Sequence, residues 1–571
     1  MGYRRRVTGA VAAGGCVLMI GAPSTADAQR GPDAPLYTPE PGDRDLKSTL
    51  FNWTWHMGML RGIEEHELIV SLEYQGSGTV EVDGEPCTLT RYRASTNYQT
   101  PGQRIRYSCR LPSGEEHSNV EVVSGRFAWD EDIAGAEIVP GEGTATPMPD
   151  AVDERLIRLW ASPQGAPKAA LAGAGLDPLA MDRNLGGLLE AGTATIGETS
   201  VTWEGGSPVV TYPIPGVDGA TAVATLDDRF MTEGVVVRHG STTTEFDYRD
   251  YNDWNNPLNR IEVYYPGSIT ETQNGDVVSN LTTVETETGS VYVVVPVPAS
   301  VGDAEWSQTF ASDRAVTLTS DAPTPRLADG KPDLTGNWNS RGMNWRYGNR
   351  RCSPTQLDGC SPAWNQTVDF EFEAPSRFGP NRPVYRPEHW DRVQYLDMWT
   401  NLEDPVMTCQ PLGIPRQLNP RRIYHTLNDI ALIYGNGGDG GGGYSDMRFA
   451  PTDGREHDER QIIQTRYTGH PVGHWEGDTL VVDSIGFVDR TWLARGGFFH
   501  SHEMRVIERL TRQGNQILYE ITVEDPLVLA EPWVMTPRIW ELGDNPDAGL
   551  LPDRGYCEIY ELDNITNQIR H

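Results

Sequence analysis

The stretch that decides the fold is residues 504–523, MRVIERLTRQGNQILYEITV. Apolar and β-branched residues recur along both halves, which predicts strands over Met504–Thr511 and Ile517–Val523. The turn between them, QGNQ, places a glycine beside an asparagine, and both residue types tolerate the positive φ of a tight hairpin. Similar turn chemistry occurs in WEGDT at residues 475–479. An antiparallel meander is therefore expected.

Further strands on both sides of this hairpin extend the predicted meander from about residue 460 to the C-terminus. The expected strands are Gln461–Thr468, Gly473–Trp475, Thr479–Ile485, Met504–Thr511, Ile517–Val523, Trp533–Leu542 and Cys557–Leu562. Hairpin-linked strands in such a short stretch favour a closed β-barrel, because closure removes the exposed edges of a sheet.

The N-terminal half also shows the short alternation of β-strands. The expected strands are Leu68–Tyr74, Gly78–Val82, Arg104–Leu111, Val120–Ala128, Thr199–Trp203, Val209–Tyr212, Ala220–Leu226, Gly234–His239, Thr242–Tyr248, Arg260–Tyr265, Val277–Glu285 and Tyr292–Val295. Helices are expected at Ala151–Trp160, which has an acidic first turn, and over Lys168–Ala174 and Asp182–Leu189. This order predicts a curved antiparallel sheet with helices on its concave face.

The glycine and proline content and a proline-containing polar stretch indicate the domain organisation. The 571 residues include 60 Gly and 41 Pro, which is typical of turn-rich β structure. The polar, proline-punctuated stretch DAPTPRLADGK at residues 321–331 predicts a linker between domains at 46–320 and 332–571. Residues 29–45 are expected to form an extended leader.

The N-terminus has the features of a bacterial secretory signal peptide over residues 1–28. Three arginines precede the apolar stretch Val7–Ala22, and an A-x-A cleavage pattern ends at Ala28. A periplasmic or secreted protein is therefore expected. Lipidation of Cys16 is the alternative, although the usual preceding leucine is absent. No later stretch is apolar over the length of a membrane-spanning helix.

The formal charge of −33 at pH 7 restricts the partners. It argues against a protein that follows nucleic-acid phosphates or adheres to anionic lipid. Lys47, Lys168 and Lys331 are the only lysines in the sequence, so arginine is the main basic residue for ion pairs or anion binding.

Without Cys16, six cysteines remain, an even number that suits disulfides in an oxidising compartment. Position along the chain suggests the pairs Cys87–Cys109, Cys352–Cys360 and Cys409–Cys557. Six cysteines allow 15 pairings, so the sequence leaves the connectivity open. A cysteine-rich metal site is disfavoured because the chain lacks a C-x-x-C pair.

The densest group of candidate catalytic residues lies in GHPVGHWEGD and FFHSHEMRVIER, at residues 469–478 and 498–509. His500 and His502 would share a strand face, and His474 could join them from a neighbouring strand to hold Zn²⁺. Acid–base chemistry by these histidines with Glu503 or Asp489 is a second interpretation. The third is that the histidines are loop residues that hydrogen-bond to the backbone.

Aromatic and arginine residues supply a second set of candidates for ligand binding. Trp53 and Trp55 could line an apolar groove, or they could be ordinary core beneath a first helix. The remaining candidates are Arg416, Arg421, Arg422 and Trp475. Arginines could clamp a carboxylate in a bidentate fashion, and aromatic rings could stack on a ligand. In so acidic a protein, the arginines could instead pair internally with Asp or Glu.

Several motifs of the N-terminal half resemble the bacterial periplasmic lipoprotein-carrier-like β module. They are FDYRDYN at residues 246–252, PLNRIEV at 257–263, LTTV at 281–284 and YVVVPV at 292–297. The resemblance implies an incomplete barrel whose apolar concave face is covered by helices, and the carriers of that family bind acyl chains there.

The C-terminal half resembles a large family of secreted bacterial proteins of uncharacterised function. The similar motifs include PDLTGNW at residues 332–338, QPLGIPR at 410–416 and HWEGDTLVVDSIGF at 474–487. The G-x-W at the first strand also resembles a lipocalin-like opening. This resemblance implies no reaction, ligand or catalytic residue.

The sequence therefore predicts a mainly β protein of two antiparallel β domains. An incomplete barrel with covering helices is followed by a lipocalin-like or related closed barrel. The expected function is binding of an apolar or amphiphilic small molecule or lipid, without nucleic acid or a predicted cofactor. The alternatives are a secreted hydrolase, isomerase or lyase that uses the C-terminal His/Glu/Arg cluster, and a structural or interaction protein of the cell envelope.

Overall fold

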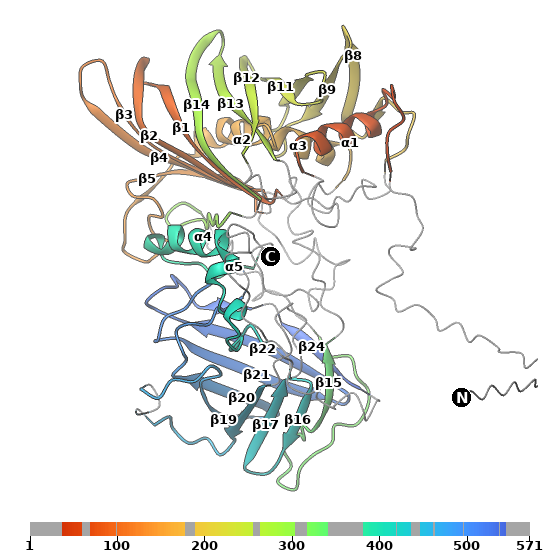
Figure 1. Ribbon diagram of the computed structural model, residues 1–571, viewed down its shortest axis with the longest axis vertical. Coiled ribbons are helices and arrows are strands. Elements are labelled where there is room, and N and C mark those ends of the chain that lie inside the picture. The colour runs from red at the N-terminus through yellow and green to blue at the C-terminus, as the bar shows by residue number, and fades with distance from the viewer. Residues whose placement is uncertain are drawn as a thin grey trace, which may run out of the picture. The chain divides into compact units, whose positions relative to one another are not determined.

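The computed structural model of the chain consists mainly of two antiparallel β-sheets with a few short helices (Figure 1). The structure describes residues 37–59, 69–98, 100–176, 189–254, 263–289, 291–302, 317–340, 381–417, 420–434, 446–458, 460, 463–494, 496–535 and 537–543. The predicted signal peptide, the strand predicted at Cys557–Leu562 and all but the last residue of the helix predicted at Asp182–Leu189 lie outside these residues.

The first sheet has 14 strands, and its hydrogen-bonded order is β6-β5-β4-β3-β2-β1-β14-β13-β12-β11-β10-β9-β8-β7. The strands are β1 (Ser71–Val82), β2 (Glu85–Asn97), β3 (Gly102–Arg110), β4 (Glu116–Ser124), β5 (Phe127–Glu131), β6 (Ala145–Pro147), β7 (Thr195–Ile196), β8 (Thr199–Glu204), β9 (Ser207–Pro213), β10 (Thr221–Leu226), β11 (Thr232–His239), β12 (Thr242–Asp253), β13 (Tyr264–Gln273) and β14 (Asp276–Gly289). Neighbouring strands are antiparallel. The centre of the sheet joins its first strand to its last, with Ser71 opposite Gly289.

Helices α1 (Leu46–His56), α2 (Val152–Ala161) and α3 (Gly165–Gly173) lie against one face of this curved sheet (Figure 1). Asp45 begins α1 by accepting a hydrogen bond from the Ser48 amide. The α2 backbone is tied to the sheet, because the Tyr248 hydroxyl donates to the Ala161 carbonyl at 2.9 Å. The prediction of an open sheet with covering helices is confirmed, and α2 starts one residue later than expected.

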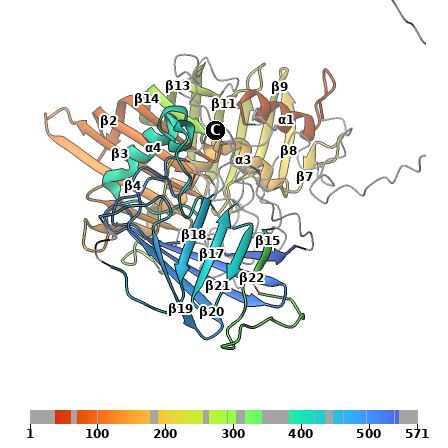
Figure 2. The same ribbon diagram turned by 60° about the horizontal axis from the view of Figure 1, so that its bottom comes forward.

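The second sheet has 10 strands in the order β18-β17-β16-β15-β24-β22-β21-β20-β19, with β23 also paired to β22 (Figure 2). The strands are β15 (Gly336–Ser340), β16 (Arg422–His425), β17 (Asp429–Tyr434), β18 (Asp446–Pro451), β19 (His470–Glu476), β20 (Thr479–Ile485), β21 (Arg505–Gln513), β22 (Gln516–Glu524), β23 (Trp533–Val534) and β24 (Arg538–Leu542). The Gly454 amide donates to the Gly473 carbonyl at 3.0 Å, so the two ends of the sheet nearly close into a barrel. The predicted fold class is confirmed.

Residues 291–297 serve two hydrophobic cores by simple alternation. Tyr292 and Val294 belong to the core beneath the second sheet. The alternate residues pack with Trp129 beside the first sheet; they are Val291, Val293, Val295 and Val297. Alternate residues of an extended chain point to opposite sides, so one short segment completes both cores. This segment, predicted as a strand at Tyr292–Val295, lies outside both sheets.

The strand predictions fail where alternation is interrupted or where a loop is apolar. Strand β2 was not predicted, because a register shift between Leu89 and Arg91 breaks its alternation and its outer face is polar. The strand predicted at Gln461–Thr468 is wrong: residues 463–468 form turns, and Arg466 makes only an isolated bridge with Phe487. Short α4 (Trp390–Met398) and α5 (Thr400–Glu403) were also unexpected.

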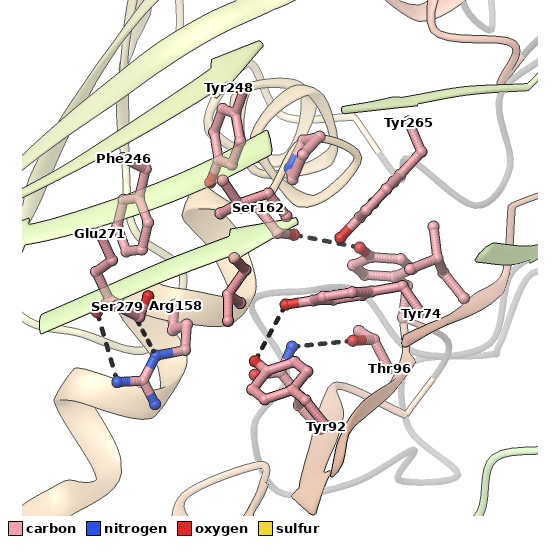
Figure 3. A pocket seen from close by; sticks show the side chains of 16 residues that line it. Tyr74, Tyr92, Thr96, Arg158, Ser162, Phe246, Tyr248, Tyr265, Glu271 and Ser279 are labelled. Carbon is pink, nitrogen blue, oxygen red and sulfur yellow. Dashed lines mark hydrogen bonds and ion pairs between the residues drawn. The ribbon is translucent and has the colours of Figure 1, made fainter. Parts of the chain in front are cut away.

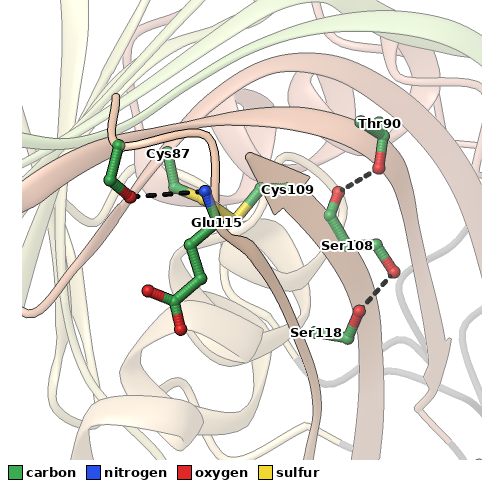
Figure 4. The surroundings of a disulfide bond; sticks show 7 residues. Cys87, Thr90, Ser108, Cys109, Glu115 and Ser118 are labelled. Atoms are coloured by element: carbon green, nitrogen blue, oxygen red, sulfur yellow. Dashed lines mark hydrogen bonds between the residues drawn. A yellow bond between two sulfur atoms is a disulfide. The ribbon is translucent and has the colours of Figure 1, made fainter. Parts of the chain in front are cut away.

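The predicted Cys87–Cys109 disulfide is present and joins β2 to β3 (Figure 4). Cys409 is also disulfide-bonded, and its partner lies outside the described residues. Cys352, Cys360 and Cys557 are themselves outside those residues, so their predicted pairing stays a prediction. Among the helices described here, none has the length and hydropathy needed to cross a membrane.

Candidate functional site

A small pocket lies between the inner face of the first sheet and the end of α2 (Figure 3). Its lining combines aromatic, aliphatic and polar side chains: Leu72, Tyr74, Tyr92, Thr96, Tyr98, Gln103, Arg158, Ser162, Pro163, Phe246, Tyr248, Tyr265, Ile269, Glu271, Ser279 and Leu281. The cavity has a volume of ≈ 40 Å³. That is room for about three water molecules, so an acyl chain would require the covering groups to move.

Strand periodicity brings these side chains together. Leu72 and Tyr74 are two residues apart on β1, and Phe246 and Tyr248 are two apart on β12. Residues at this spacing share a face of the sheet, so each strand contributes a pair to the pocket. These strands lie near the centre of the sheet, and α2 contacts the sheet on both sides of them, at β3–β5 and at β11.

Tyrosines form a hydrogen-bonded aromatic wall along the pocket. The ring centroids of Tyr74 and Tyr265 are 5.2 Å apart, those of Tyr74 and Tyr92 are 5.7 Å apart, and the hydroxyls of the latter pair are 3.2 Å apart. Burial raises the pKa of all three phenols. They are therefore neutral at pH 7 and offer hydroxyl groups for hydrogen bonding beside apolar rings.

Arg158 of α2 connects the helix to the sheet at the edge of this pocket. Its guanidinium pairs with Glu271 of β13 at 3.2 Å, with Glu121 of β4 at 3.2 Å and with Glu154 of its own helix at 3.0 Å. Burial lowers the pKa of Arg158, but Glu271 and Glu121 offset this and leave the pKa well above its ordinary value. The helix that covers the pocket is thus held by a charged contact.

The predicted groove residues Trp53 and Trp55 do not line this pocket. Trp53 is fully buried, and its indole N–H donates to the Thr232 hydroxyl at 2.9 Å. Trp55 stacks on Phe51 with centroids 5.8 Å apart. Their surroundings agree with the alternative of core packing beneath α1, and their proposed ligand role stays untested.

The residues of the predicted arginine clamp lie in different surroundings, and their role in ligand binding stays a prediction. Arg416 is buried and makes a bidentate pair with Asp404, both bonds being 2.7 Å. Arg422 lies over the Tyr424 ring at 4.8 Å, and Arg421 is exposed just before β16 begins. Trp475 packs beside His425, with ring centroids 5.6 Å apart. Internal pairing therefore accounts for Arg416.

The three candidate zinc ligands occupy different environments. His474 and His502 are exposed. The Nε2 of His474 lies 3.3 Å from Oε1 of Glu476, and the Nε2 of His502 lies 3.7 Å from Oε1 of Glu503. His500 is buried: its Nδ1–H donates to the Ser501 carbonyl at 2.8 Å, and its Nε2 accepts from the Thr491 hydroxyl at 2.7 Å. Within the described ranges, no three His, Cys, Asp or Glu side chains form a group that could hold a metal ion. The postulated three-histidine site is therefore not formed.

The buried His500 predicts a pH dependence of stability. Burial lowers the pKa of His500 below its ordinary value of 6.5. The unfolded chain therefore binds the proton first, and the contribution of the neutral ring is lost as pH falls below about 6.5. His500→Gln should reduce the slope of unfolding free energy between pH 7.5 and 5 by up to about 1.4 kcal/mol per pH unit. Chemical unfolding at each pH measures this, with exposed His502→Gln as the control; equal slopes in all three proteins would contradict it.

Comparison with solved structures finds weak similarity to a known protein. The crystal structure of a LolA superfamily protein from Nitrosomonas europaea matches with a TM-score of 0.21 and 11% sequence identity, covering 41% of this chain and 91% of that chain. The lipoprotein-carrier-like N-terminal module stays a prediction from the sequence motifs. The sequence matches no family model and no curated protein, so the C-terminal resemblance finds no support.

Proposed function

We propose that this protein binds an apolar or amphiphilic small molecule or lipid on the inner face of the first sheet. The tyrosine-lined pocket under α2 carries the proposal, because aliphatic side chains, aromatic rings and a few oriented polar groups converge there. Apolar groups would contact a chain or ring, and the hydroxyls of Tyr74 and Tyr92 would hydrogen-bond a polar end. Arg158 holds α2 at the edge of the cavity through ion pairs with Glu121 and Glu271. Displacement of α2 would break these pairs and enlarge the cavity.

We also infer that this binding takes place outside the cytoplasm. The Cys87–Cys109 disulfide supports an oxidising compartment, as do the features of a signal peptide at residues 1–28. The proposed domains at 46–320 and 332–571 would make the ligand site a property of the first domain. No observation on the described residues favours the hydrolase alternative over binding.

A blocking substitution tests the proposed site. Ile269 lines the pocket from β13, whereas Thr270 follows it on the opposite face of the strand. Ile269→Trp should fill the cavity and weaken binding of the fluorescent amphiphile 11-(dansylamino)undecanoate at least about tenfold, whereas Thr270→Trp should bind like the parent protein. Dansyl fluorescence titration measures both.

Overpacking by tryptophan costs about 1–3 kcal/mol, so thermal unfolding must first show that both variants are folded. Equal affinity of the two folded variants for the amphiphile would refute this site. Absence of saturable binding by the parent protein would refute the proposed function for acyl amphiphiles.

A further inference from the structure

Three arginines gather on the face of the first sheet opposite the tyrosine pocket. Arg93 of β2 lies directly across from Arg106 of β3, and Arg104 lies across from Ser95 two residues along. Tyr92 and Gln103 face the tyrosine pocket, so their sequence neighbours Arg93 and Arg104 point to the other side of the sheet. Like charges directly opposite each other destabilise a sheet, so the Arg93–Arg106 pair needs a compensating group.

Two of these arginines already have carboxylate partners. Arg104 donates through Nε and Nη2 to Glu131 at 3.0 and 3.2 Å, and Arg93 pairs with Glu73 at 2.5 Å and with Asp391 at 2.8 Å. Glu131 also accepts from the Trp129 indole, and Glu73 accepts from the Ser95 hydroxyl and the Gln394 amide. These carboxylates are therefore occupied by other donors.

Arg106 is the exception. Its side chain is half-buried, yet in the part of the chain that the structure describes no hydrogen bond or ion pair involves its guanidinium. Burial and the positive charge of Arg93 lower the pKa of Arg106, and the nearby carboxylates of Glu73 and Asp391 offset this only in part. The Nε of Arg93 is buried and likewise has no hydrogen-bond acceptor among the described residues. Among these residues, Arg106 and the Nε of Arg93 thus lack an acceptor, although the carboxylates of Glu73 and Asp391 line the same cavity.

This cavity has a volume of ≈ 20 Å³ and lies between β1–β3 and α4. All three arginines line it, together with Glu73, Ser95, Tyr292, Val293, Val294, Trp390, Asp391 and Gln394. The Trp390 ring covers Arg104 at 4.7 Å from its centroid. The space is that of one or two water molecules, so a carboxylate or phosphate group would require the lining side chains to move apart.

We propose that this arginine pocket binds a small oxyanion, a carboxylate or a phosphate group, bridged between Arg106 and Arg93. Planar guanidinium groups match both oxyanions through paired N–H donors, which a lysine ammonium does not reproduce. The bound anion supplies the acceptors that Arg106 and Arg93 Nε lack, and it neutralises the cross-strand repulsion. The chain as a whole carries −33, so attraction arises from these local donors rather than from the overall field.

Isothermal titration calorimetry with inorganic phosphate and with acetate, in low-salt buffer free of other oxyanions, tests the proposal. The parent protein should bind one anion saturably, and Arg106→Gln should bind it at least about tenfold more weakly. Arg110→Gln is the matched control, because Arg110 is on the same strand but exposed and paired with Glu116 at 2.7 Å. Tighter binding of phosphate would identify a tetrahedral ligand group, and tighter binding of acetate a planar one.

No saturable binding of either anion, or equal affinity of Arg106→Gln and the parent, would overturn the proposal. Thermal unfolding gives an independent readout. Without anion, Arg106→Gln should be at least as stable as the parent, because the substitution removes a repulsion; a lower midpoint would show that Arg106 is structural and would also overturn it. The Ile269→Trp variant should retain anion binding, since its pocket lies on the other face.

Discussion

Glu508→Ala is expected to lower the free energy of unfolding by about 3–5 kcal/mol, because it breaks a buried ion pair. Glu508 of β21 and Arg448 of β18 face each other inside the second sheet, joined by bonds of 2.6 and 3.1 Å. Their side chains are 1% and 0% exposed. Removal of the carboxylate leaves a guanidinium buried without its counter-charge, which is far costlier than loss of an exposed pair.

Further hydrogen bonds around the Arg448–Glu508 pair increase the expected loss of unfolding free energy. The Tyr519 hydroxyl donates to Glu508 at 2.6 Å, and Arg448 also donates to the Tyr434 hydroxyl and to Ser484. Burial lowers the pKa of Arg448, but Glu508 outweighs that effect and raises the pKa above its ordinary value. Glu508→Ala therefore removes the acceptor of one tyrosine as well as the counter-charge of the arginine.

Urea unfolding followed by tryptophan fluorescence measures this effect. Asp453→Ala is the control, because Asp453 forms an exposed pair with Arg455, and no measurable change is expected there. The double variant Arg448→Met/Glu508→Leu should recover much of the loss, since well-packed apolar residues can replace a buried pair. A loss below about 1 kcal/mol for Glu508→Ala would be incompatible with a buried, desolvated pair.

Trp160→Ala is expected to lower the free energy of unfolding by about 3–5 kcal/mol and to weaken binding of the dansyl amphiphile. Trp160 is fully buried in α2, and its ring lies 6.1 Å from that of Tyr98, a residue of the tyrosine pocket. Deletion of the indole leaves a cavity between the helix and the sheet. The helix would then hold the pocket less firmly.

Trp160→Phe separates packing from hydrogen bonding. The Trp160 indole N–H is buried, and among the described residues no group accepts from it. Phenylalanine keeps an aromatic ring and removes this unsatisfied donor. Trp160→Phe should therefore lower the free energy of unfolding by less than about 1.5 kcal/mol. Urea unfolding of both variants measures the difference. Equal losses for alanine and phenylalanine would mean that the indole's volume does not set the stability of this region.

The fold followed from the sequence where turn chemistry and alternation agree. Strand β20 has the predicted bounds Thr479–Ile485, and the β21–β22 hairpin surrounds the expected Gly514–Asn515 turn. Strand β2 escaped prediction because its bulge shifts the apolar pattern from one set of alternate positions to the other. The strands β16–β18 are short and were also missed.

The candidate sites were much harder to predict than the strands. The tyrosine pocket draws residues from β1, β2, β3, β12, β13 and β14, so strand order had to be known before they could be grouped. One signal was present: Phe246 and Tyr248, in the motif that resembles a lipoprotein carrier, both line the pocket. The arginine pocket depends on register, because Arg93 and Arg106 become neighbours only through the β2–β3 pairing.

The joining of β1 to β14 at the centre of the first sheet has a consequence for the order of folding. Every other ladder of that sheet joins strands that are consecutive in the chain, whereas Ser71 must find Gly289. Closing such a long loop carries the largest entropy cost, so the two halves of the sheet can form as separate meanders before they meet. Until β14 has been synthesised, β1 remains an open edge that can pair with another chain.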